Sequence, residues 1–146
     1  MIANIRIRDS GQSKLLCQLD LMRFSEEQVR ERMRERGIRD DTFFVCGFVD
    51  WNVDSEMSLE LAYALKRCIH EIYNDDESIV VDLLKRHVPP IVIISRYYRF
   101  ISKDEHDTAF YLLEHTNISQ FMIAKALDDG VLATNEKGFY IADTQI

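Results

Sequence analysis

The sequence predicts an α+β protein in which small mixed subdomains with short antiparallel sheets flank a helical middle. β-branched and aromatic runs separated by turn residues occur near both ends of the chain, and helical periodicity dominates its centre. At 146 residues the chain can form one domain or two or three small subdomains. We therefore expect residues 1–50 to form an N-terminal α+β subdomain, residues 51–90 a helical subdomain and residues 91–146 a C-terminal α+β subdomain.

The first 50 residues are predicted to form two strands, a helix and a third strand. Residues 2–8 and 15–22 are strand-like runs on either side of a turn segment rich in polar residues. A capping box that starts at Ser25 marks the beginning of a helix, and Gly37 suits the left-handed position after its end. Residues 42–49 are aromatic and β-branched, which favours a strand.

The middle of the chain is predicted to hold two helices. Ser58 can cap a helix over residues 59–73, in which apolar residues recur at helical spacing and share one face. A second, short helix over residues 78–87 ends before Pro89 and Pro90, because the residue that precedes a proline avoids helical geometry.

The last third is predicted to be mixed again. Residues 91–95 form a β-branched run that favours a buried strand. A capping box that starts at Ser102 opens a helix, for which Ala109, Phe110, Leu112 and Leu113 would supply the apolar face. Asn117 can cap a further short helix over residues 119–127, and residues 130–142 form a hairpin.

Composition argues for a cytoplasmic protein. Cys17, Cys46 and Cys68 are widely spaced and odd in number, which is typical of reduced thiols and not of a disulfide framework. The longest apolar runs, such as residues 91–94, are far too short to cross a bilayer, and no signal peptide is visible. We therefore expect a cytoplasmic location and no membrane partner.

No arrangement of residues indicates an enzyme. The phosphate-binding glycine loops are absent, and Cys46 beside Gly47 has no assignable triad partner, so a buried structural thiol is the simpler interpretation. The histidines, none of which has metal-ligand spacing, are His70, His87, His106 and His115. We expect no catalytic residue, no metal site and no cofactor.

The predicted helix over residues 26–36 carries both charge signs in rows four residues apart. One row consists of Glu27, Glu31 and Glu35. Two more rows consist of Arg30 with Arg34 and of Arg32 with Arg36. A solvated helix with weak ion pairs is the simple interpretation, and a functional basic patch is the alternative.

Two aromatic features allow more than one interpretation. Trp51 is either an interface anchor or a core residue. The segment 97–100, Tyr-Tyr-Arg-Phe, is either a stacking platform or part of a sheet whose side chains pack a core.

The surplus negative charge lies in the last two-thirds of the chain. Residues 1–50 hold nine basic and nine acidic residues, whereas residues 51–146 hold nine basic and sixteen acidic ones, which accounts for the net charge of −7. A clustered acidic surface suggests a basic partner and argues against direct nucleic-acid binding, although solubility is the simpler explanation of charge alone. The candidate partner-binding residues are Asp54, Glu56, Glu60, Glu71, Asp75, Asp76, Glu77, Asp82, Asp104, Glu105, Asp107, Glu114, Asp128 and Asp129.

Three stretches resemble the ArdA antirestriction family of mobile genetic elements. The first is the capping-box helix over residues 25–33. The second is the segment 48–54, which leads through residues 58–61 into a helix. The third is the tail, in which residues 118–127 fall where the family has a Tyr-Gly-Arg-Asp-Leu motif and are followed by the closing hairpin.

The resemblance implies an elongated, curved α+β protein that forms homodimers through its C-terminal subdomain. It also implies that acids along the outer face bind type I restriction-modification enzymes in place of DNA, without catalysing a reaction. We therefore expect a cytoplasmic DNA mimic whose partner is a DNA-binding protein such as a restriction-modification enzyme. The alternatives are an inhibitor or immunity-type module that binds another target through a local patch, and a small enzyme with a pocket around His106 or Cys46.

Overall fold

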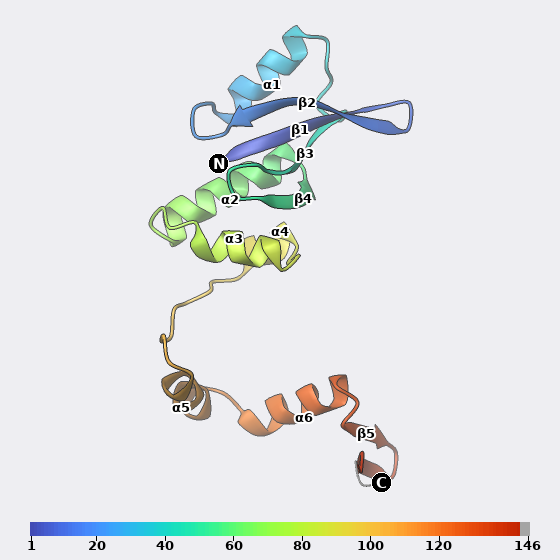
Figure 1. Cartoon of the computed structure of the whole chain (residues 1–146), viewed down its shortest axis with the longest axis vertical. Helices are drawn as coiled ribbons and strands as arrows, with labels where there is room; N and C mark the ends of the chain where they lie inside the picture. The colour runs from blue at the N-terminus through green and yellow to red at the C-terminus, as the bar shows by residue number, and fades with distance from the viewer. Residues whose placement is uncertain (144–146) are drawn as a thin grey trace. The chain divides into compact units, whose positions relative to one another are not determined.

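The computed structural model describes residues 1–143 of the chain (Figure 1). Over these residues the fold is α+β, as predicted, with six helices, a four-stranded antiparallel sheet and a two-stranded antiparallel sheet. The chain divides into two compact units, Met1–Tyr98 and a second that begins at Arg99. The boundaries predicted from the sequence lie near residues 50 and 90, whereas the boundary between the units follows Tyr98.

The four-stranded sheet has the order β2-β1-β3-β4, so the first strand is central. Ser10 and Gly11 connect β1 and β2, and both have positive φ, which matches the two-residue hairpin turn whose twist suits antiparallel strands. The fourth strand was not predicted, because its five residues carry only two buried apolar side chains, Val53 and Met57. The strands are β1 Ile2–Asp9, β2 Gln12–Asp20, β3 Phe43–Phe48 and β4 Val53–Met57.

Gly47 is required where β3 meets its neighbours. The register of β3 against β4 shifts between Val45 and Gly47, which is a bulge. A Cβ atom at position 47 would lie 2.2 Å from the carbonyl oxygen of Val53, so only glycine allows this approach of the two backbones. The Cys46-Gly47 pair therefore has a structural explanation.

The helix α1, Glu26–Glu35, begins and ends as predicted. The Ser25 hydroxyl accepts a hydrogen bond from the Gln28 amide at 3.2 Å, and the Gln28 side chain accepts one from the Ser25 amide at 2.9 Å. Gly37 has φ +75° and follows the last turn, where the Ile38 amide donates to the carbonyl of Met33. This closes the helix with the left-handed motif that glycine favours.

Three helices follow the sheet in the first unit: α2 Leu59–Ile72, α3 Ser78–Lys85 and α4 Pro90–Ser95. The predicted strand over residues 91–95 is wrong, because these residues form α4. Pro90 occupies the first helical turn, where its missing amide costs nothing, and Ile93 is fully buried. Tertiary packing against α2 and α3 has outweighed the β propensity of the isoleucines and valine.

The helices and the four-stranded sheet share one hydrophobic core. Phe48 from the sheet, Leu65 from α2, Val80 from α3 and Ile93 from α4 are all fully buried in it. In Figure 1 these helices gather beside β3 and β4. The predicted N-terminal and helical subdomains therefore lie in one unit, because neither buries its apolar face without the other.

The second unit contains α5 Glu105–His115, α6 Ile118–Asp128, β5 Leu132–Asn135 and β6 Gly138–Ile141. Asp104, not Ser102, caps α5, since its carboxylate accepts a hydrogen bond from the Asp107 amide at 3.2 Å. Ser102 instead hydrogen-bonds to the Asp104 backbone and to the Thr108 hydroxyl. The Asn117 cap and the closing hairpin are as predicted.

The second unit has no buried side chain among residues 99–143. The apolar face predicted for α5 is exposed at Ala109, Phe110 and Leu113 and half-buried at Leu112, so the unit itself does not cover it. Phe121 on α6 and Phe139 on β6 are 61% and 62% exposed. Two helices and one short hairpin supply too little surface to cover these side chains within the unit.

Candidate functional site

All fourteen acids predicted to bind a partner are exposed. Those of the first unit lie on β4, on α2, in the turn between α2 and α3, and on α3. Those of the second unit lie at the start and end of α5 and at the end of α6. The structure therefore places every candidate carboxylate in contact with solvent.

Few of these acids have a basic partner. Within residues 1–143, three of the fourteen form ion pairs: Glu56 with Arg8 at 2.5 Å, Asp75 with His70 at 2.8 Å, and Asp129 with Lys125 at 3.1 Å. Two more, Asp76 and Asp104, each accept a hydrogen bond from a backbone amide at a helix start. For the other nine, the described residues provide no side-chain hydrogen bond or ion pair: Asp54, Glu60, Glu71, Glu77, Asp82, Glu105, Asp107, Glu114 and Asp128.

The acids of residues 1–50 behave differently, because arginines neutralise several of them locally. Asp40 accepts an ion pair from Arg34 at 2.9 Å and lies 3.9 Å from Arg30. Glu26 pairs with Arg30 as well. Several opposite charges of the first 50 residues therefore pair with each other, whereas the surplus acids further along the chain face solvent.

The second unit carries the densest surplus. Residues 99–146 hold four basic and eight acidic residues, a net charge of −4. Asp104, Glu105 and Asp107 crowd the first turn of α5, where they also complement the positive end of the helix dipole. Helix stabilisation accounts for this cluster in part, but not for Glu114 and Asp128 near the ends of their helices.

The residues considered for catalysis or metal binding do not form a common site. Burial raises the pKa of the Cys46 thiol, although the nearby Arg6 lowers it in part, so this thiol is not an activated nucleophile. His106 packs edge-on against Phe110, and His115 stacks on its neighbour Tyr111. Across residues 1–143, no three potential ligands lie close enough to hold a metal ion.

The structure decides between the two interpretations of Trp51. Its side chain is 6% exposed and its ring centroid lies 4.7 Å from that of Phe48. Trp51 is therefore a core residue and not an interface anchor.

The aromatic segment 97–100 is not part of a sheet, so that prediction is wrong. Tyr97 and Phe100 are 64% and 73% exposed. The Tyr98 amide donates a hydrogen bond to the Tyr73 hydroxyl, while Arg99 donates one to the Tyr111 hydroxyl. The first of these contacts ties the end of the first unit to α2.

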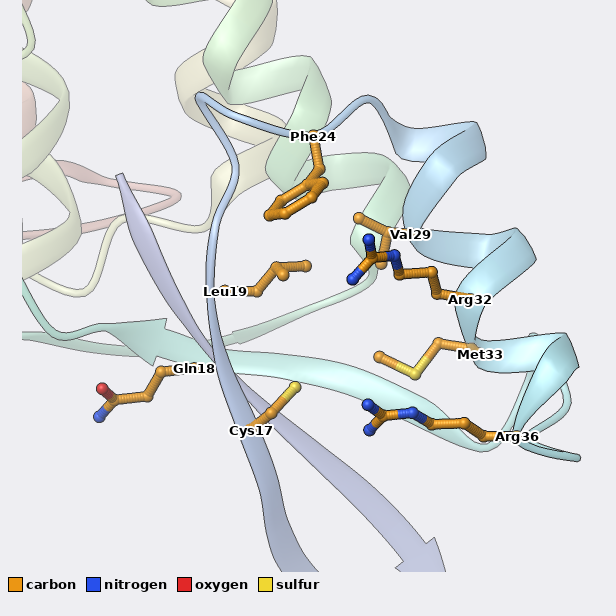
Figure 2. Close-up of a pocket in the computed structure, with 8 residues that line it drawn as sticks. All are labelled: Cys17, Gln18, Leu19, Phe24, Val29, Arg32, Met33 and Arg36. Atoms are coloured by element: carbon orange, nitrogen blue, oxygen red, sulfur yellow. The ribbon is translucent and has the colours of Figure 1, made fainter.

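A cavity that the sequence did not reveal lies between α1 and β2 (Figure 2). Its volume is about 190 Å³. The apolar part of the lining consists of Leu19, Phe24, Val29 and Met33. The cavity is also lined by Cys17 and Gln18 on β2, and two cationic side chains, Arg32 and Arg36, extend across it from α1. In the sequence, the cavity is indicated only by the helical spacing of residues 29, 32, 33 and 36, which places them on one face of α1. This spacing does not show which segment lies opposite that face.

No protein-family model, curated protein or solved structure matches the chain. Every helix within residues 1–143 is too short or too polar to pass through a lipid bilayer.

Proposed function

We propose that the protein is a non-enzymatic, acidic DNA mimic that inhibits a type I restriction-modification enzyme in the cytoplasm. One observation carries the proposal: all fourteen candidate acids are exposed, and within residues 1–143 three of them have a basic partner. Unpaired carboxylates remain available to the lysines and arginines that line a DNA-binding cleft. Direct binding to nucleic acid is disfavoured, because phosphates repel such a surface.

The mechanism requires carboxylates to replace phosphates. Duplex DNA carries one negative charge per about 1.7 Å of helix axis, and a cleft that binds it is lined with positive charge. Exposed acids are attracted to such a cleft at long range and release the anions held there. Association is therefore expected to be fast at low ionic strength and to weaken as salt is added.

A homodimer joined through the C-terminal unit is part of the proposal. Phe110, Phe121, Phe139 and Ile141 expose 59–75% of their surface, and no side chain within residues 99–143 is buried. Association with a second copy would cover apolar surface that a unit of this size cannot cover itself.

Neutralising unpaired acids of the second unit tests the proposal. Glu105→Gln, Glu114→Gln and Asp128→Asn are combined, because these side chains have no hydrogen bond or ion pair within the described residues and only Glu105 adds to the helix dipole interaction of α5. The triple variant is expected to weaken inhibition of DNA cleavage by roughly tenfold or more, because each lost charge removes attraction to the cleft. Affinity of the parent protein, measured by titration between low and high salt, should fall steeply.

The matched control removes the same number of charges from α1: Glu27→Gln, Glu31→Gln and Glu35→Gln. These glutamates are also exposed and form no ion pair within residues 1–143, but they belong to the balanced first 50 residues. Equal inhibition by the two triple variants and the parent, together with salt-independent binding, would rule out DNA mimicry. The cluster Asp75–Glu77 is less suitable, because Asp75 pairs with His70 and Asp76 accepts a hydrogen bond from the Ser78 amide.

The exposed aromatic side chains favour one second candidate, an inhibitor or immunity-type module that binds its target through a local patch. In that case Phe121→Ser should abolish target binding while the acidic triple variant binds normally. Small-angle scattering adds an independent criterion, because DNA mimicry predicts an extended dimer and the local-patch function predicts a compact monomer.

A further inference from the structure

The cavity between α1 and β2 combines an apolar wall with two cationic side chains (Figure 2). Val29 and Met33 are buried on the inner face of α1, and Leu19 and Phe24 complete the apolar wall. A pocket lined by hydrophobic side chains with a few placed polar groups is the usual form of a small-molecule site.

Arg32 and Arg36 differ from the other arginines of the same helix. Arg30 pairs with Glu26 and Asp40, and Arg34 pairs with Asp40. Arg32 and Arg36 form no ion pair with any residue in the described part of the chain.

Arg32 and Arg36 lie in and directly after the last turn of α1, where cations complement the helix dipole, but their like charges repel each other. They are separated by four residues, so their like charges face each other across one helical turn and destabilise the helix slightly. The guanidinium of Arg32 lies 5.2 Å from the ring centroid of Phe24, which holds it at the cavity. Arg36 is close enough to Cys17 on β2 to lower the pKa of that thiol, although burial raises it more.

We propose that this cavity binds a small carboxylic acid with an apolar body. The carboxylate would pair with Arg32 and Arg36, whose planar guanidinium groups suit two-point recognition of a carboxylate. The apolar body would lie between Leu19, Val29 and Met33. An engineered apolar cavity of about 150 Å³ holds benzene, so about 190 Å³ accommodates a body of roughly six to eight carbons.

This site is independent of the proposed inhibition of a DNA-binding protein. It lies in the first 50 residues, where the formal charges balance, and it uses none of the fourteen candidate acids. Failure of either proposal therefore leaves the other unaffected.

The full-length protein is titrated with sodium octanoate, and its amide chemical shifts are measured by two-dimensional NMR at each step. Saturable shifts are expected at Leu19, Val29 and Met33. Octylamine has the same chain with the opposite charge and should not produce these shifts. Acetate should bind about 100-fold more weakly than octanoate, because it lacks the methylene groups that the apolar wall would bury.

The double variant Arg32→Gln, Arg36→Gln should bind octanoate about tenfold or more weakly, because it loses the charge-assisted hydrogen bonds. Both side chains are exposed and unpaired, so the variant is expected to fold, and its amide spectrum without ligand verifies this. The matched control is the double variant Arg23→Gln, Arg39→Gln, since it removes two cations from exposed positions that do not line the cavity and should leave affinity unchanged.

Cys17 offers an independent readout because it lines the cavity, whereas Cys46 does not. Octanoate should slow alkylation of Cys17 by iodoacetamide and leave the rate at Cys46 unchanged, as measured by mass spectrometry of peptides. The proposal is overturned by an absence of saturable shifts at millimolar octanoate. Equal binding of octylamine, or unchanged affinity in the double arginine variant, would overturn it as well.

Discussion

Individual polar side chains anchor the segments around the first unit's core. The hydroxyl of Tyr63 on α2 donates a 2.6 Å hydrogen bond to the carbonyl of Phe24, and burial raises the pKa of Tyr63 to about 12. Lys66, one turn further along α2, donates to the carbonyl of Leu21 at 2.7 Å. These contacts hold the segment between β2 and α1, and with it one wall of the cavity that Phe24 lines.

His70 and Asp75 provide a pH-dependent pair at the residue scale. The hydrogen bond to Asp75, supported by the charge of that carboxylate, raises the pKa of His70 above its ordinary value of 6.5. The pair therefore contributes its full stabilisation below pH 6.5 and loses it as the pH rises through the raised pKa of the folded state. Both side chains are exposed, so the contribution to stability is small.

We expect Asp75→Asn to shift the pKa of His70 downward, toward the value of an isolated histidine. An NMR titration of the imidazole resonances measures this directly. Glu71→Gln is the control, because Glu71 raises the pKa of His70 less than Asp75 does. An identical His70 titration curve in the parent and in Asp75→Asn would show that the pair does not form in solution.

At the scale of elements, the helix caps were the best predicted features of the chain. Ser25, Ser58 and Asn117 each accept the expected hydrogen bond from a backbone amide at a helix start. Capping depends on residues three positions apart, so it can be read from the local sequence. The prediction failed at α5 because Asp104 lies two residues after Ser102 and competes for the same role.

Ser25→Ala is expected to lower the free energy of unfolding by about 1 kcal/mol, because it leaves the Gln28 amide without its acceptor. Urea denaturation followed by circular dichroism measures the change. Ser25→Asp retains a good cap and should recover most of the loss. If Ser25→Ala were as stable as the parent, the capping box would contribute nothing to α1.

At the scale of the whole molecule, the two units differ in what stabilises them. Every buried residue within residues 1–143 belongs to the first unit, which contains the sheet and the helices α1 to α4. Over residues 99–143 the second unit has regular secondary structure but no buried residue. The dimer that we propose would cover its exposed apolar side chains, such as Phe121 and Phe139.

A chain that ends at Tyr98 is expected to unfold cooperatively with a midpoint within a few degrees of that of the first unit in the full-length protein. It retains the whole core and the hydrogen bond between Tyr98 and Tyr73. Differential scanning calorimetry compares the two chains. A broad, non-cooperative transition in the shortened chain would show that the second unit supports the first.

The sequence by itself determined the caps at Ser25, Ser58 and Asn117, the α+β class, the closing hairpin and the excess of acids after residue 50. These features depend on neighbours within a few positions or on composition alone. Only the tertiary structure decided that residues 91–95 form a helix, that Val53–Met57 joins the sheet and that Trp51 is buried, because packing against distant segments outweighs local propensity. It also decided which charges are paired, and it created the cavity at Arg32 and Arg36, because both depend on which side chains the fold brings together across many residues of chain.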